Sequence, residues 1–151
     1  MLDFMPFLRE RAYVIKRFHP FSVPKDIFSF VGEFVRSLFG EDKSLKLAIL
    51  SPTKATEEAL QDELYDMRQS FEELTIETID RVQGLTVDFS ILVLTLTNPS
   101  FSLNLSRFNV ATSRAERGTL IITDSKYTQY KCIHPQVTDY LNLCPRMEFS
   151  R

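Results

Sequence analysis

The sequence predicts an α/β fold in which helices cover a mainly parallel sheet. Short apolar segments alternate with longer segments of helical periodicity, a pattern typical of right-handed crossover units. Two of the apolar segments, 45–50 and 89–97, are almost continuous, as expected for strands covered on both faces. The length of 151 residues suits one domain, and 44% of the residues are hydrophobic, which is enough for a core.

The elements follow one another along the chain. Strands are expected at residues 13–18, 45–50, 75–80, 89–97 and 118–124. Helices are expected at residues 26–39, 54–68, 103–117 and, with a break at Pro135, 126–143. We expect a single domain, 1–151, in which residues 125–151 form a C-terminal extension with no assigned role.

Composition and charge narrow the classes of function. The chain has 18 basic and 20 acidic residues, which gives a net charge of −2. A free-standing nucleic-acid-binding protein usually has a clear basic excess, so the charge argues against that class. The two cysteines form no Cys-x-x-Cys pair, so no metal site is expected. No apolar stretch approaches the length of a membrane span, which predicts a soluble cytoplasmic protein.

The segment 78–87 holds the first group of candidate functional residues. Ligands of parallel sheets bind beyond the carboxyl ends of the strands, and residues 80–87 are expected at that edge of the sheet. Gly84 allows a close approach of the backbone, and Gln83 can both donate and accept hydrogen bonds. Taken alone, a Gln-Gly pair is more typical of an ordinary turn between two strands.

The segment 106–117 holds the second group, which is basic. On a helix, Arg107 and Arg114 would share one face about 10 Å apart, with Arg117 one turn further on. Arginine suits phosphate because its planar guanidinium makes bidentate contacts and stays charged. Without further context, a solvated basic helix face is the more common explanation of such a row.

Together and in order, these segments resemble the late motifs of superfamily 1 helicases, in particular the Upf-like and RecD-like branch and its viral relatives. "SPTKAT" at 51–56 resembles the strand end that touches the nucleic-acid backbone. "TIDRVQGLTVDFSILVL" at 78–94 resembles motif V, and "RFNVATSRAERGTLIITD" at 107–124 resembles motif VI and the strand after it. The resemblance runs from about Tyr13 to Asp124.

The resemblance implies a role for individual residues. In that family two RecA-like domains hold ATP between them, and each grips one side of a single strand. Arg114 would be the arginine finger that stabilises charge on the transferring phosphoryl group, and Arg107 would support it or pair with an acid. The residues implied at the nucleotide are Gln83, Gly84, Thr86 and Arg117. The residues implied at the nucleic-acid backbone are Ser51, Pro52, Thr53, Thr78 and Asp80.

The resemblance also implies the fold and the partners. The fold would be a RecA-like three-layer sandwich, the second of the two motor domains. Its partners would be single-stranded nucleic acid and the N-terminal RecA-like domain of the same polypeptide. ATP and Mg²⁺ would be bound mainly by that other domain.

The sequence departs from the family in two places. Members commonly carry Glu where this chain has Thr86. None of the four glycines begins or completes a G-x-x-x-x-G-K-[ST] loop, so the chain lacks its own phosphate-binding loop. We therefore do not expect the isolated chain to hydrolyse ATP.

Two other functions remain open. A degenerate helicase-like module could act in protein interaction or regulation, which Thr86 and the negative net charge favour slightly. A flavodoxin-like nucleotide-binding domain is disfavoured because no glycine-rich loop follows the first strand. The acidic residues of the helix 54–68, among them Glu57, are expected to be solvated.

Overall fold

The described part of the chain is built on one six-stranded sheet. The computed structural model describes residues 12–15, 24–39, 44–82, 84–94, 101, 103–123, 129–144 and 146–147. The strands are β1 (Ala12–Ile15), β2 (Lys46–Ser51), β3 (Glu73–Thr78), β4 (Val87–Leu94), β5 (Ala115–Thr123) and β6 (Arg146–Met147). They lie in the order β3-β2-β4-β5-β1-β6, and every pairing is parallel.

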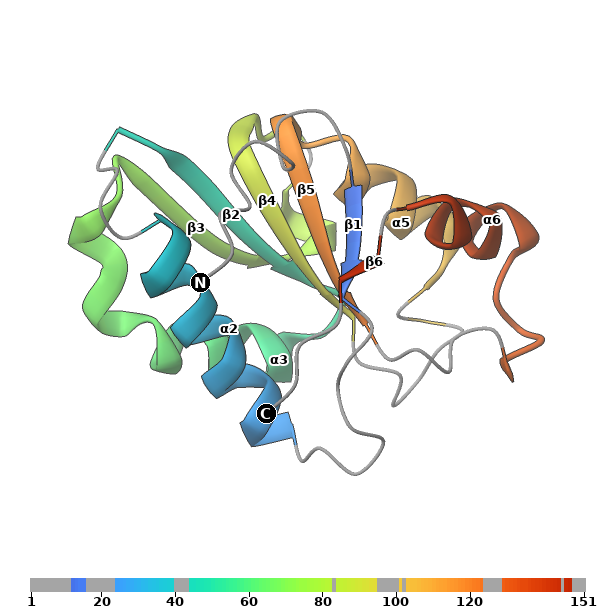
Figure 1. The fold of residues 1–151 in the computed structure, drawn as a ribbon, viewed down its shortest axis with the longest axis horizontal. Helices are drawn as coiled ribbons and strands as arrows, with labels where there is room; N and C mark the ends of the chain where they lie inside the picture. The colour runs from blue at the N-terminus through green and yellow to red at the C-terminus, as the bar shows by residue number, and fades with distance from the viewer. Residues whose placement is uncertain are drawn as a thin grey trace.

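Helices cover both faces of the sheet (Figure 1). The helices are α2 (Pro24–Phe39), α3 (Lys54–Glu63), α5 (Leu105–Thr112) and α6 (Pro135–Leu143). On one face, Leu47 and Ile49 of β2 pack in a cluster with side chains of α2 and α3. On the other face, Ala48 and Leu50 pack with side chains of α5 and α6. This alternation confirms the predicted three-layer α/β sandwich, the arrangement of a RecA-like fold.

The helix α3 is held closely against α2. A Cβ atom on Gly32 would lie only 2.9 Å from Cγ of Glu63, so the two helices approach where a side chain is absent. Arg36 of α2 donates hydrogen bonds of 2.9 Å to the Glu63 carbonyl and to Asp66 Oδ1. The hydrogen bond from Arg36 lowers the pKa of Asp66 below its usual value. These contacts fix the position of α3, whose first residues follow the end of β2.

The predicted helix at 103–117 is wrong in its second half. Helix α5 ends at Thr112, and Ala115 already belongs to β5. The Oγ1 atom of Thr112 donates to the Phe108 carbonyl, and both Oγ and N of Ser113 donate to the Val110 carbonyl. The Val110 carbonyl in the last turn is thus satisfied locally, while β5 pairs with β4. Strand pairing therefore overrides the helical propensity of the residues after Ser113.

Smaller differences affect the other boundaries. The predicted helix 54–68 ends at Glu63 and continues as a 3-10 segment, η1 (Tyr65–Ser70). The predicted strand 75–80 lies two residues earlier, as β3, and is followed by a 3-10 turn, η2 (Ile79–Arg81). The strand predicted at 89–97 begins at Val87, and its last three residues lie outside the described part, as do residues 16–18 of the first predicted strand.

The region after β5 contributes to the core. Pro135 does not break the predicted helix but starts it, with His134 as the N-cap whose Nδ1 accepts from the Gln136 amide. Val137 and Leu141 of α6 are fully buried beside α5, and the short strand β6 pairs with β1. In the part of the chain that the structure describes, no helix is long and apolar enough to cross a membrane.

Leu141→Ala tests whether α6 stabilises the fold. Leu141 is fully buried and packs in the cluster on the α5 side, so we expect a loss of about 2–5 kcal/mol in the free energy of unfolding. Leu143→Ala is the matched control, because Leu143 lies on the same helix and is 85% exposed. Urea denaturation measures both variants; equal stabilities for the two would show that α6 is not part of the core.

Candidate functional site

The candidate residues lie at two opposite edges of the sheet. Because the strands are parallel, their carboxyl ends meet at one edge and their amino ends at the other. Ser51 and Thr78 are paired at the ends of β2 and β3, so they mark the carboxyl edge. The carbonyl of Arg114 accepts a 3.1 Å hydrogen bond from the amide of Val87, the first residue of β4. Arg114 therefore marks the amino edge.

The prediction that residues 80–87 lie at the carboxyl edge is wrong for the later residues of that range. Strands β3 and β4 both flank β2 in parallel, so the chain between them must return to the amino edge. The segment crosses the face that α5 and α6 cover, where Ile79 and Val82 are buried. Gly84 and Thr86 consequently stand just before β4, at the edge where Arg114 lies.

Most of the polar atoms at the end of β2 are used within the turn itself. The Ser51 hydroxyl has no exposed surface; it donates to the Thr53 carbonyl at 2.8 Å and accepts from the Thr53 amide at 3.2 Å. Pro52 is also buried. Thr53 is the N-cap of α3, and its hydroxyl bonds to both the amide and the hydroxyl of Thr56. The half-buried Thr53 and Thr78 are the accessible hydroxyl-bearing residues among those predicted at this edge.

Lys54 is a basic residue at this edge whose role was not predicted. Its side chain is 56% exposed in the first turn of α3, and its Nζ lies 3.2 Å from Oε2 of Glu57. Glu57 was expected to be solvated, but it is only 4% exposed. The spacing of Lys and Glu at i and i+3 could have indicated the ion pair, whereas the burial of Glu57 depends on the sheet beside it.

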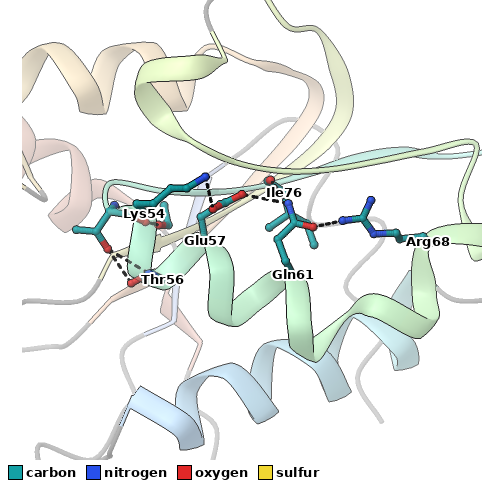
Figure 2. Close-up of polar contacts among 8 residues, drawn as sticks. Lys54, Thr56, Glu57, Gln61, Arg68 and Ile76 are labelled. Carbon is teal, nitrogen blue, oxygen red and sulfur yellow. Dashed lines mark hydrogen bonds and ion pairs between the residues drawn. The ribbon is translucent and has the colours of Figure 1, made fainter.

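Figure 2 shows that Glu57 belongs to a chain of polar side chains along α3. Gln61 donates from Nε2 to Glu57 Oε1 at 3.1 Å and to the Ile76 carbonyl at 2.8 Å. Arg68 donates to the other end of the Gln61 amide. The buried carboxylate thus accepts a hydrogen bond from an amide at Oε1, whereas Oε2 accepts no hydrogen bond among the described residues and lies beside the Lys54 ammonium. The amide also satisfies a carbonyl of β3, the last strand of the sheet on this side.

Arg107 and Asp80, predicted for different ligands, are brought together. The Nε atom of Arg107 lies 3.2 Å from Oδ1 of Asp80, and the guanidinium carbon lies 3.9 Å from the centre of the Phe101 ring. The side chain of Arg107 is 26% exposed and that of Asp80 is 58% exposed. Arg107 therefore links α5 to η2. Two roles were predicted for it, support of Arg114 or pairing with an acid, and the structure shows it paired with an acid.

The three arginines predicted to share one helix face, Arg107, Arg114 and Arg117, do not do so. Arg114 lies in the turn after α5, where its Nε atom is buried without a hydrogen-bond partner and its Nη2 donates to Ser113 Oγ at 2.8 Å. Among the described residues it has no ion pair. Arg117 lies on β5 near a register shift, with its guanidinium carbon 4.8 Å from the centre of the Phe89 ring. Phe89 belongs to the cluster on the α2 and α3 face, so Arg117 points away from α5.

The nucleotide-side residues are only partly described. Gln83 lies outside the described residues. Gly84 has a φ of +86°, the one positive φ among the described residues, and Thr86 is exposed. The amide of Leu85 donates to the Val82 carbonyl at 3.0 Å, which closes the turn around Gly84. The amino edge therefore presents a tight glycine turn, a short neutral hydroxyl and the guanidinium of Arg114.

One comparison with known proteins bears on these residues. A family model described as an AAA domain matches residues 25–126, about two thirds of the chain. The match includes both edges of the sheet and every candidate residue, whereas α6 and β6 lie beyond its end.

Gly84→Ala tests the turn at the amino edge. Nothing lies within 4 Å of the position of the new Cβ atom, so the cost comes from the positive φ alone, about 1–2 kcal/mol. Gly84→Asn should lose less, since Asn tolerates this conformation better than Ala. Chemical denaturation measures both variants. A stability of Gly84→Ala equal to that of the wild type would mean that the turn does not keep this conformation in solution.

Proposed function

Since the chain belongs to the AAA domain family, whose members occur in Upf1-like superfamily 1 helicases, we propose that it acts as the second motor domain of such a helicase. In this proposal it supplies an arginine finger and part of the track for a single strand. The segments 78–94 and 107–124 would be motifs V and VI. The phosphate-binding loop and the residues for Mg²⁺ would come from the N-terminal RecA-like domain of the same polypeptide.

The surroundings of Arg114 support the proposed contact with the nucleotide. A buried donor such as its Nε atom costs free energy when it has no acceptor, and the described residues provide no carboxylate for its charge. An anion arriving from outside the domain would compensate the charge of the guanidinium. The turn between α5 and β5 fixes the backbone of Arg114, because its carbonyl accepts from Val87.

The chemistry expected of Arg114 is electrostatic. ATP, when bound by the partner domain, supplies the phosphoryl group and the leaving group. A guanidinium held at the edge of the second domain can stabilise negative charge that develops on the phosphoryl oxygens. Thr86 adds a neutral hydroxyl at the position where relatives commonly carry Glu, so it would contribute no charge.

The carboxyl edge carries the nucleic-acid half of the proposal. The half-buried Thr53 and Thr78 and the exposed ammonium of Lys54 lie at neighbouring strand and helix ends. Hydroxyl and ammonium groups bind phosphate oxygens without reading bases, which suits a protein that moves along a strand. The small number of such groups agrees with the slightly negative net charge of −2.

A degenerate module for protein interaction remains the second candidate. The observation that favours it is that two of the three arginines contact residues of the domain itself: Arg107 pairs with Asp80, and Arg117 lies over the Phe89 ring. Arg114 is then left as the candidate arginine finger. The two functions differ in what Arg114 does: a finger accelerates hydrolysis, whereas a surface residue of an interaction module has no effect on turnover.

Arg114→Ala distinguishes them. In a polypeptide that joins this domain to a phosphate-binding-loop domain, we expect ATP turnover in the presence of a single-stranded oligonucleotide to fall about a thousandfold, with nucleotide binding largely retained. Arg68→Ala is the control, since Arg68 is exposed and bonds to Gln61 on α3. A steady-state phosphate-release assay measures both. Turnover of Arg114→Ala equal to that of the control would exclude the arginine finger.

Lys54→Gln tests the strand track in the 151-residue chain. Losing one phosphate contact should weaken binding of a labelled single-stranded oligonucleotide and reduce the slope of log K against log salt by about 0.7. Lys46→Gln is the matched control, because Lys46 begins the same strand β2 whose carboxyl end precedes Lys54. Fluorescence anisotropy at several salt concentrations measures the slopes. A larger change for Lys46→Gln would contradict the assignment of the carboxyl edge.

A further inference from the structure

The side chain of Arg107 joins three separate segments of the chain. It lies in the first turn of α5, pairs with Asp80 of η2 at 3.2 Å and stacks on Phe101 at 3.9 Å. We call these three residues the Arg107 clamp. The start of α5 is itself fixed, because Oδ1 of Asn104 accepts from the amides of residues 106 and 107.

The clamp lies near the carboxyl edge of the sheet and connects it with the amino edge through α5. On one side, Asp80 is two residues from Thr78, whose strand ends at the carboxyl edge. On the other side, α5 ends at Thr112, directly before the turn that holds Arg114 at the amino edge. The helix between them is a stiff link, because Phe108 is buried and its ring meets Tyr140 of α6 edge-on at 5.1 Å.

We propose that Arg107 is a positioning residue that couples a single strand at the carboxyl edge to the placement of Arg114 at the amino edge. The inference rests on the proposed function and names a route within it. A phosphate that binds at Thr78 displaces the neighbouring η2 turn, the ion pair carries that displacement to α5, and α5 carries it to the turn at Arg114. Arg107 then touches neither the nucleic acid nor the nucleotide.

The exposure of the clamp suits a coupling contact better than a structural one. An ion pair that is partly open to water contributes little to stability, so it can loosen and reform without unfolding the domain. The Phe101 ring keeps the guanidinium near Asp80 by cation–π attraction while the pair is loosened. The core contacts of α5 through Phe108 remain in both states, which keeps the displacement directed along the helix.

The test follows the backbone amides of the ¹⁵N-labelled 151-residue chain by NMR while a single-stranded oligonucleotide is added. In the wild type we expect direct shifts at Thr53 and Thr78 and remote shifts at Gly84 and Arg114. In Arg107→Gln the direct shifts and the affinity should be kept, while the remote shifts fall at least about twofold, the lower end of such couplings. The spectra also show whether each variant is folded.

A double-mutant cycle separates coupling through the ion pair from a general loss of structure. Asp80→Asn should reduce the remote shifts as Arg107→Gln does, and the double variant should add little, because both break one contact. Arg107→Lys should restore part of the remote shifts, since it keeps the charge but loses the planar stacking on Phe101. Arg68→Gln, an exposed arginine elsewhere, is the control and should behave as the wild type.

Three outcomes would overturn the proposal. Remote shifts in Arg107→Gln equal to those of the wild type would show that the clamp carries no coupling. A loss of oligonucleotide affinity with the direct shifts reduced in parallel would make Arg107 a ligand of the strand. The absence of any shift at Thr53 and Thr78 in the wild type would remove the strand track, and with it both the proposed function and the coupling.

Discussion

The parallel direction of every strand pairing is the constraint on which the rest of the structure depends. Each connection must carry the chain from the carboxyl edge of the sheet back to the amino edge. Two successive connections, η2 with the residues after it and then α5, do so on the same face. Because they lie beside each other, residues that end one strand and residues that begin another come to share a surface.

This constraint separates the chemistry of the site into two parts. Hydroxyl groups and an ammonium gather where β2 and β3 end, at Thr53, Lys54 and Thr78. A glycine turn and a guanidinium that has no ion pair among the described residues lie where β4 and β5 begin, at Gly84 and Arg114. In the proposed function, one edge holds the strand and the other presents a cation to the nucleotide. The Asp80–Arg107 pair is the contact that bridges the two connections.

Much of the fold could be predicted from sequence, because continuous apolar segments mark strands that are buried on both faces. The strand β2, with five of its six residues buried, is the clearest example. The candidate site residues came from the resemblance of segments 78–94 and 107–124 to helicase motifs, because a Gln-Gly pair or a row of arginines alone is more typical of a turn or a solvated helix face. The arrangement of these residues could not be predicted, because the end of α5 at Thr112 depends on the pairing of β5 with β4, which are distant in the sequence. Likewise, the burial of Glu57 depends on the polar chain through Gln61 to the carbonyl of Ile76, which no local pattern shows.

Photo-crosslinking tests whether the single strand lies at the carboxyl edge and leaves the amino edge to the nucleotide. A single-stranded oligonucleotide carrying photoreactive bases would be irradiated with the 151-residue chain, and the attached peptides identified by mass spectrometry. We expect crosslinks in the peptides that contain Thr53, Lys54 and Thr78, and none at residues 84–86 or 113–116. Crosslinks confined to residues 84–86 and 113–116 would place the strand at the amino edge and contradict the proposed separation of the two sites.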